Sequence, residues 1–286
     1  MTEAALNIDH LRTWIGKTRH DEDVISLRHA NIMAVTIDYP DMSRIVEGGD
    51  LPPLWHWLYF LEGEPPQALG GDGHPARGGF LPPVPLSNRM WAGGRVSFLK
   101  PVRIGSRVRK VSSILKVDHK TGRSGDLVFV TVLHEITSPV GELLIREEHD
   151  IVYKNVVRPV AAATASRVAN AAPAPHCRTF SPTSTTLFRY SALTFNGHRI
   201  HYDQDYCRHT EGYENLVIHG PLIATLLAGF AEEIAGRPLR EFNYRGLAPA
   251  LLGNTITFSA TPEDGRVRLS AHLGSGTCSM DAEALL

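Results

Sequence analysis

The densest group of chemically capable side chains in this sequence lies near residue 200. Asn196, His198, His201 and Asp203 follow one another within a short polar segment. A neutral imidazole has a pKa near 6.5, so it can take a proton from water at physiological pH. We therefore expect His201 to act as a general base. The alternative is a capping turn, in which Asp203 caps a short helix through Tyr206 and the histidines only bind backbone groups.

A second candidate group, His219-Gly220-Pro221, follows shortly afterwards and opens an apolar stretch. Proline is typical of the first turn of a helix, and glycine lets a ligand approach the backbone closely. Free N–H groups at a helix start can hold a thioester oxygen as negative charge develops on it. We therefore expect His219 and Gly220 to contact substrate. The alternative is an ordinary helix entry.

Arginine can bind carboxylates and phosphates because its guanidinium is a planar fork of donors. Arg89, Arg199 and Arg245 are candidates for this role, against the alternative that each is solvated or bridges the core. The spacing His198-x-x-His201-x-Asp203 superficially resembles a set of metal ligands. A zinc site needs three or four convergent ligands, and this spacing in a turn does not supply them. We therefore predict no metal.

The composition is that of an ordinary globular protein. The chain has 286 residues, 43% of them hydrophobic and 21% charged, with a formal net charge of −1. A net charge near zero does not predict binding to nucleic acid or to an anionic membrane surface. The three cysteines are widely spaced, which predicts reduced thiols. No secretory signal or membrane-spanning run is recognised, so we expect a cytoplasmic protein.

The chain divides into two halves. Residues 160–175 are rich in alanine and end in alternating prolines, which indicates a linker between domains at 1–159 and 176–286. In the first half we predict a helix at 21–38 and a long Pro- and Gly-rich loop at 62–85. We also predict three strands, at 111–117, 127–137 and 143–153, and two hairpin turns, at 122–125 and 139–141.

The second half repeats this organisation. A strand is expected at 186–193, a long helix at 222–234, and further strands at 254–260, 267–273 and 277–282. The pattern Pro101-x-x-x-Gly105-x-x-Val108 recurs as Pro249-x-x-x-Gly253-x-x-Ile256. Together with the similar strand runs, this weak repeat favours an α+β protein made of two copies of a helix-plus-antiparallel-sheet unit.

Several motifs of the chain resemble those of MaoC-like hydratases and dehydratases. They are most similar to the double-hotdog hydratases of the mesaconyl-C4-CoA and itaconyl-CoA type, and to hydroxyacyl-thioester dehydratases type 2. The motifs lie in both halves. They are Leu51-Pro-Pro-Leu-Trp-His-Trp57, Asp72-Gly-His-Pro75, Arg89-Met-Trp-Ala-Gly-Gly94, Gly125-Asp-Leu-Val-Phe-Val130, Phe195–Asp203, Val217–Pro221 and Asn243–Pro249.

The resemblance implies a double hotdog, in which two helix-wrapped antiparallel sheets share one chain and one site. It implies reversible hydration of a 2-enoyl thioester by the second unit, without a cofactor. The family motif Asp-x-Asn-Pro-x-His-x-Asp places its histidine on His201 and its last aspartate on Asp203, but its first aspartate falls on Asn196. An amide cannot take up a proton as a carboxylate does. Either His201 works alone while Asn196 orients water, or His198 or Asp203 supplies the missing function.

We expect the substrate to be a short branched dicarboxylyl-CoA, such as mesaconyl-C4-CoA or itaconyl-CoA, whose carboxylate meets Arg199 or Arg89. The alternatives are a 3-hydroxyacyl-thioester dehydratase of fatty acid synthesis, a hotdog acyl-CoA thioesterase and a non-catalytic acyl-thioester binding protein. A metal-dependent hydrolase is a more distant possibility. A fused pair of hotdogs needs no second chain to complete its site, so a monomer or a homodimer is expected.

Overall fold

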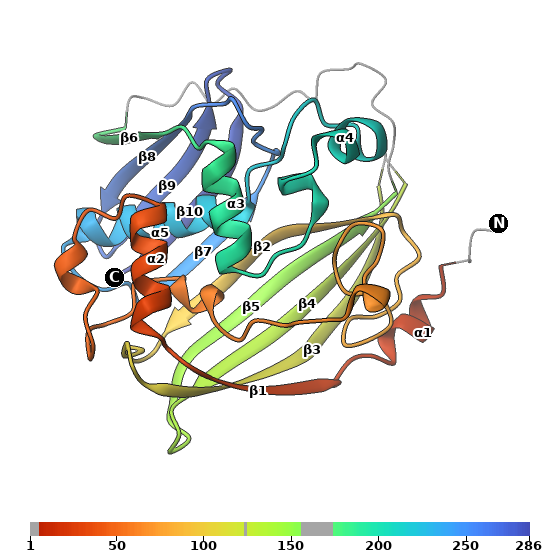
Figure 1. The fold of residues 1–286 in the computed structure, drawn as a ribbon, viewed down its shortest axis with the longest axis horizontal. Helices are drawn as coiled ribbons and strands as arrows, with labels where there is room; N and C mark the ends of the chain where they lie inside the picture. The colour runs from red at the N-terminus through yellow and green to blue at the C-terminus, as the bar shows by residue number, and fades with distance from the viewer. Residues whose placement is uncertain (1–5, 123–124, 156–173) are drawn as a thin grey trace.

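The computed structural model describes residues 6–122, 125–155 and 174–286, whose strands form one curved antiparallel sheet (Figure 1). The first half of the chain contributes β1 (Thr18–Val24), β2 (Asn88–Phe98), β3 (Arg107–Gly122), β4 (Gly125–Thr137) and β5 (Leu143–Lys154). The second half contributes β6 (His176–Phe180), β7 (Glu241–Gly246), β8 (Ile256–Glu263), β9 (Arg266–Leu273) and β10 (Cys278–Leu285).

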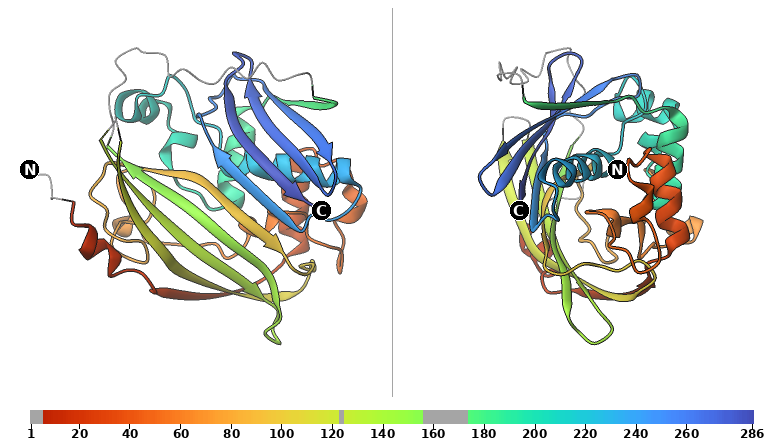
Figure 2. Two further views of the ribbon diagram at one scale, coloured as in Figure 1. Left: turned by 180° about the vertical axis from the view of Figure 1, so that it is seen from behind. Right: turned by 90° about the vertical axis from the view of Figure 1, so that its left-hand side faces the viewer.

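The two halves have the same strand topology. The sheet runs β1-β3-β4-β5-β2-β7-β10-β9-β8-β6, so each half places its strands in an equivalent order around a shared centre. The halves join through β2 and β7, which pair from Gly93↔Arg245 to Ser97↔Glu241. Figure 2 shows the two halves side by side in this continuous sheet. The predicted α+β double hotdog is confirmed.

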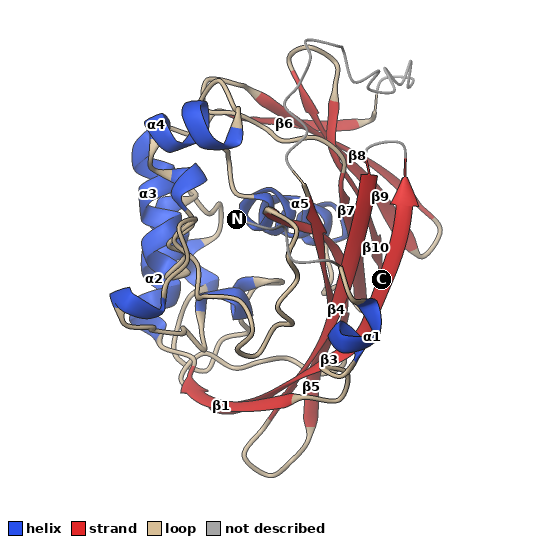
Figure 3. Ribbon diagram, turned by 90° about the vertical axis from the view of Figure 1, so that its right-hand side faces the viewer, coloured by secondary structure: helices blue, strands red, loops and turns tan. Residues whose placement is uncertain are grey.

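The helices gather on one face of the sheet. They are α1 (Ile8–Arg12), α2 (Leu27–Thr36), α3 (Ser184–Leu193), α4 (Gln204–Tyr206) and α5 (Gly220–Ala235). The long helix α5 packs against β7–β10, as the apolar stripe predicted. It ends at Gly236, whose positive φ of 63° suits a residue without a Cβ atom. Figure 3 shows α5 between the sheet and the α2–α3 pair.

The first half has no counterpart of α5 in the described part of the chain. Between α2 and β2 it contains short 3-10 turns, including Trp55–Leu58 and Pro66–Ala68, and the long loop predicted at 62–85. The concave face of β3, β4 and β5 is therefore not filled by a helix. This difference leaves room for the cavity described below.

Two predicted elements are wrong. Residues 186–193 form most of α3 rather than a strand, because Thr183 and Thr186 make a capping box and the buried side chains recur at helical spacing. Residues 21–38 form a helix only from Leu27 onward, since the residues before it belong to the edge strand β1.

Other predictions have clear outcomes. The strands expected at 111–117, 127–137 and 143–153 lie within β3, β4 and β5, and those expected at 254–260, 267–273 and 277–282 match β8, β9 and β10. The three cysteines are unpaired. Most of the linker at 160–175 and the centre of the turn at 122–125 lie outside the described residues. No helix among the described residues is long and apolar enough to cross a bilayer.

Candidate active site

A cavity of about 1680 Å³ lies between the two halves of the molecule. Its walls come from the concave face of β3–β5, the long loop of the first half, the polar segment after α3 and the start of α5. Binding sites for small molecules usually measure about 300–1000 Å³, so this space can hold an acyl group together with part of a thioester carrier.

His201 lies on the wall of this cavity and is 7% exposed. Its Nδ1 atom is 2.7 Å from the carbonyl oxygen of Val217, and because a carbonyl only accepts, Nδ1 carries the proton. Nε2 is then free to accept. Burial lowers the pKa of His201 to about 4, although the bond to Val217 raises it. The ring is therefore neutral near pH 7, which is the form that a general base requires.

His219 lies behind His201 and does not reach the cavity wall. The two rings stack with centroids 3.6 Å apart, and the Nε2 atom of His219 is 2.9 Å from the hydroxyl of Ser191. The side chain of His219 is fully buried. The prediction that His219 contacts substrate is thus not supported by its position. Its stacking contact instead restricts the orientation of the His201 ring.

Gly220 does line the cavity, as predicted. The first backbone hydrogen bond of α5 runs from Ile223 to His219, so the N–H of Gly220 belongs to the free donors of the helix start. The ring of Trp91 packs directly on this glycine. A Cβ atom at residue 220 would lie 2.7 Å from the Trp91 ring, so a larger residue would displace it.

Asn196 and His198 also lie on the wall. The side-chain oxygen of Asn196 accepts the backbone N–H of His198 at 3.0 Å, which leaves the amide nitrogen to donate to a ligand. Burial and the neighbouring His74 lower the pKa of His198 to about 2. Asn196 therefore shapes the turn and can orient water, while His198 is a neutral ring beside His201.

Asp203 and Arg199 bind each other outside the cavity. The carboxylate of Asp203 accepts the backbone N–H of Tyr206 at 2.9 Å and the Nη2 of Arg199 at 2.7 Å. The capping interpretation is therefore correct for Asp203. Arg245 is exposed on β7 and is also absent from the cavity wall. The structure does not bring these three predicted residues to the site.

Arg89 is the candidate arginine that lines the cavity. It lies on β2, its side chain is 10% exposed, and its Nη2 atom is 3.5 Å from a carboxylate oxygen of Asp72. A guanidinium in this position brings a positive charge next to the histidine cluster. It is suited to binding a carboxylate of the substrate.

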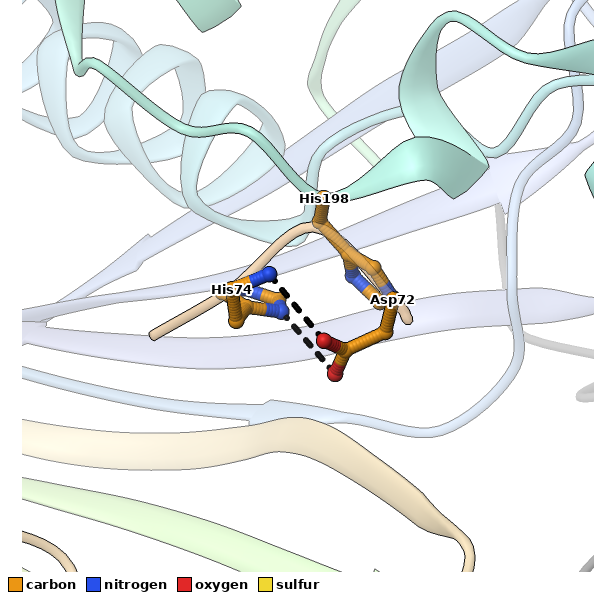
Figure 4. Close-up of side chains that lie close together, drawn as sticks. All are labelled: Asp72, His74 and His198. Carbon is orange, nitrogen blue, oxygen red and sulfur yellow. Dashed lines mark hydrogen bonds and ion pairs between the residues drawn. The ribbon is translucent and has the colours of Figure 1, made fainter. Parts of the chain in front are cut away.

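Asp72 and His74 belong to the site although the sequence analysis assigned them no chemistry. They come from the long loop of the first half, and Figure 4 shows them gathered with His198. Asp72 accepts the backbone N–H of His74 at 3.0 Å and lies 3.3 Å from its Nδ1. The rings of His74 and His198 are 4.3 Å apart. The Asp72-Gly-His-Pro75 motif was the available signal, but a motif does not show what lies opposite it.

These three side chains could hold a metal ion, because their ligand atoms lie within 4.8 Å of one another. The neighbouring guanidinium of Arg89 already supplies a positive charge to Asp72. A divalent cation would have to be placed beside that charge. The donor set therefore fits a hydrogen-bonded cluster better than a metal centre.

The largely apolar first-half wall of the cavity also carries several ionised and hydrogen-bonding side chains. Glu147 of β5 is buried and accepts hydrogen bonds at 2.9 Å from both His56 Nε2 and Trp57 Nε1. Burial alone would raise the pKa of Glu147, but the bond from His56 lowers it to about 2. His134 and Lys110 line the same wall. Its ionised and hydrogen-bonding groups make it a poor surface for a long alkyl chain.

Acidification is expected to destabilise this fold through its buried histidines. Burial lowers the pKa of His134 to about 3, of His198 to about 2 and of His201 to about 4, from an ordinary 6.5. At any pH between these lowered pKa values and 6.5, the unfolded chain therefore binds more protons than the folded chain. One histidine shifted from 6.5 to 4 costs the folded state about 2 kcal/mol at pH 5. Thermal unfolding should show a Tm that falls from pH 7 to pH 5, whereas a constant Tm would contradict the buried, neutral rings.

The double-hotdog fold is shared with MaoC-like dehydratases of known structure. A MaoC-like dehydratase from Phytophthora capsici has the same fold, with a TM-score of 0.71 at 14% identity over 98% of both chains. A Mycobacterium tuberculosis protein described as a double hotdog has a TM-score of 0.59 at 12% identity, over 95% of this chain and 96% of that one. At such identities the likeness shows the fold alone.

The family model described as hydroxyacyl-thioester dehydratase type 2 matches residues 54–252, and the chain belongs to this family. It is 44% identical over 272 residues to the mesaconyl-C4-CoA hydratase of Chloroflexus aurantiacus, covering 94% of this chain and 95% of that protein. It is 26% identical over 253 residues to the mitochondrial hydroxyacyl-thioester dehydratase type 2 of Schizosaccharomyces pombe, covering 80% and 81%, respectively. The protein is a hydro-lyase, as predicted.

Proposed function

We propose that this protein reversibly hydrates a short branched dicarboxylyl-CoA, with mesaconyl-C4-CoA as the first choice. The observation that carries the proposal is a neutral imidazole, His201, in the same cavity as a buried guanidinium, Arg89. A cation at this position can bind the free carboxylate of a dicarboxylyl substrate. The similarity to a mesaconyl-C4-CoA hydratase supports the same substrate.

The chemistry of this substrate requires a cation near the base. Mesaconic acid is methylfumaric acid, so in its C4 thioester the carbon that water attacks carries both the methyl group and the free carboxylate. The general base and the carboxylate receptor must then lie within a few ångströms of each other. Arg89, through its contact with Asp72, belongs to the cluster that also contains His74 and His198, which suits this requirement.

In the proposed reaction the thioester carbonyl accepts a hydrogen bond from the N–H of Gly220. Asn196 orients a water molecule, and His201 Nε2 takes its proton as the oxygen bonds to C3. The electron pair of the double bond moves toward the thioester oxygen, and C2 then receives a proton. An oxyanion donor of this kind contributes about 3–4 kcal/mol to lowering the barrier.

The ionised and hydrogen-bonding groups of the first-half wall favour a short acyl group over a fatty acyl chain. A long chain extending from the active site into this part of the cavity would press its methylene groups against Lys110, His134 and Glu147. Among these groups Lys110 has only a long ion pair, at 3.8 Å to Asp21, so covering its charge with hydrocarbon would cost free energy. We therefore place the dehydratase of fatty acid synthesis second.

We further propose that no cofactor is needed and that the protein works in the cytoplasm. The general base, the carbonyl donor and the carboxylate receptor are all side chains or backbone groups of one chain. A monomer or a homodimer would satisfy the site equally. Activity that persists after treatment with a chelator is the expected result.

A substrate panel tests the proposed function. Purified protein is incubated with mesaconyl-C4-CoA, itaconyl-CoA, crotonyl-CoA and a long-chain 2-enoyl-CoA, and both the enoyl absorbance and free thiol are followed. We expect kcat/KM to be highest for a dicarboxylyl thioester, by about 100-fold over crotonyl-CoA, because a buried charge pair contributes 2–5 kcal/mol. Release of free thiol would indicate a thioesterase. Binding without turnover would indicate an acyl-thioester carrier.

A further inference from the structure

Hydration of an enoyl thioester requires two proton transfers, one from water and one to C2. His201 can serve the first. The position at which the family motif has a catalytic aspartate is occupied by Asn196, which cannot be protonated, and Asp203 is bound to Arg199 away from the cavity. Either His201 makes both transfers, or a second ionisable group of the wall makes the transfer at C2.

We propose that His74, held by the carboxylate of Asp72, is a second catalytic residue that exchanges the proton at C2 of the substrate. This inference rests on the proposed hydratase function. The first half of the chain would then supply a proton-transfer group, because the second half has Asn196 where the family motif has an aspartate. The active site would then be composite, with one imidazole from each half.

The Asp72–His74 pair has the geometry of a histidine oriented by a carboxylate. Asp72 binds both the backbone N–H and the Nδ1 of His74, at 3.0 and 3.3 Å. The proton on Nδ1 then points to Asp72, and Nε2 is left to exchange a proton with substrate. A carboxylate in this position stabilises the imidazolium that forms when the ring is protonated. His198, whose ring is 4.3 Å away, has no carboxylate on its ring in the described structure.

The backbone holds this pair against the catalytic turn. The N–H of Arg199 donates to the carbonyl of Asp72 at 2.9 Å, which ties the loop of the first half to the turn that carries His201. The loop and the turn approach each other so closely at Gly73 that a Cβ atom there would lie 2.1 Å from the carbonyl oxygen of Gly197. A loop fixed in this way keeps a constant distance between His74 and the site. Such fixed placement is what a proton-transfer group needs.

The groups around His74 determine its charge. Burial lowers its pKa, the hydrogen bond with Asp72 raises it, and the positive charges of Arg89 and Arg77 lower it. For Asp72, burial alone would raise the pKa, but the bonds from His74 hold it well below its usual value, so the carboxylate is ionised. The neutral rings of His198 and His201 are further neighbours of His74. A bound carboxylate on Arg89 would offset the positive charge and favour protonation of His74.

The proton balance of the step is simple. In dehydration, Nε2 of neutral His74 takes the proton from C2, and the electron pair of that bond forms the C2–C3 double bond. The hydroxyl group leaves C3 with a proton from His201 and becomes water. Hydration is the reverse, with His201 accepting from water and His74 donating to C2. Each turnover moves one proton between the two rings, and exchange with water restores the starting state.

The variants His74→Gln and Asp72→Asn test this role. For His74→Gln we expect kcat to fall by about 100- to 1000-fold with KM within about threefold, because a general acid–base residue acts mainly on the chemical step. Added imidazole should restore part of the activity, since the cavity can admit it. Asp72→Asn should lower kcat less and should change the pH profile. Exchange of the C2 proton with D2O, followed by NMR on the hydroxyacyl-CoA, should be lost in His74→Gln.

The matched control is His119→Gln. His119 also pairs with an aspartate, Asp126, at 2.8 Å, but on the β3–β4 hairpin and outside the cavity, so this variant should keep wild-type rates. Wild-type kcat or wild-type C2 exchange in His74→Gln would overturn the proposal. So would a loss of activity that follows a loss of Tm and that imidazole does not restore. If the wild type prefers another enoyl thioester, the proposed substrate is wrong. The same variants, assayed with that thioester, still test the role of His74.

Discussion

Substitution of His201 by alanine is expected to lower kcat for hydration of mesaconyl-C4-CoA by about 1000-fold, within the usual range for a general base. The ring lies on the cavity wall and its Nδ1 donates to the carbonyl of Val217, so Nε2 is the nitrogen that is left to accept a proton from water. Stopped-time assays of the enoyl absorbance measure the change. The Tm should stay close to that of the wild type, and activity above about one-tenth would contradict the assignment.

The pH profile provides a second measure of the same residue. Because burial lowers the pKa of His201 to about 4, its base form persists down to mildly acidic pH and is lost below that value. We expect the acidic limb of kcat/KM for the wild type to fall near this pKa, measured over short times because the fold itself weakens in acid. A limb near 6.5 would indicate a solvated histidine instead.

Substitution of Arg89 by methionine is expected to change which substrate is preferred. Methionine keeps much of the side-chain volume but removes the positive charge that we assign to the substrate carboxylate. For mesaconyl-C4-CoA, kcat/KM should fall by about 100-fold, because one partner of a buried charge pair is left unpaired. Crotonyl-CoA has no carboxylate, so its kcat/KM should fall much less. The ratio of the two values separates carboxylate binding from any effect on Asp72.

Arg245→Met is the control for this experiment. Arg245 was a candidate anion binder by sequence, although Arg199 or Arg89 was expected to meet the carboxylate. Arg245 is exposed on β7 and does not line the cavity. Its substitution should leave both substrates at wild-type rates. Equal losses for both substrates in Arg89→Met would show that the guanidinium supports the fold or the histidine cluster rather than the carboxylate.

The sequence by itself determined the features that depend on neighbouring residues. The apolar stripe predicted α5, and alternating β-branched residues predicted the strands. The spacing of Asp203 to Tyr206 offered a helix cap as the alternative to a catalytic role, and the structure has that cap. The motif around His201 predicted the candidate base, because a family motif is a local pattern. The prediction from sequence failed at residues 186–193, where a strand was expected although the capping box and the spacing of the buried side chains are helical.

Only the tertiary structure decided what lies opposite the motif. Spacing along the chain cannot show that Asp72 and His74 meet His198, since their contact depends on how two distant loops pack. It cannot choose among three arginines, because the choice depends on which strand face borders the cavity: Arg89 lines it and Arg245 does not. Nor can it show that His219 stacks behind His201, since burial is a property of the packed protein. Helices and strands follow from local sequence propensity. Which residues line the site depends on how the two halves of the chain pack together.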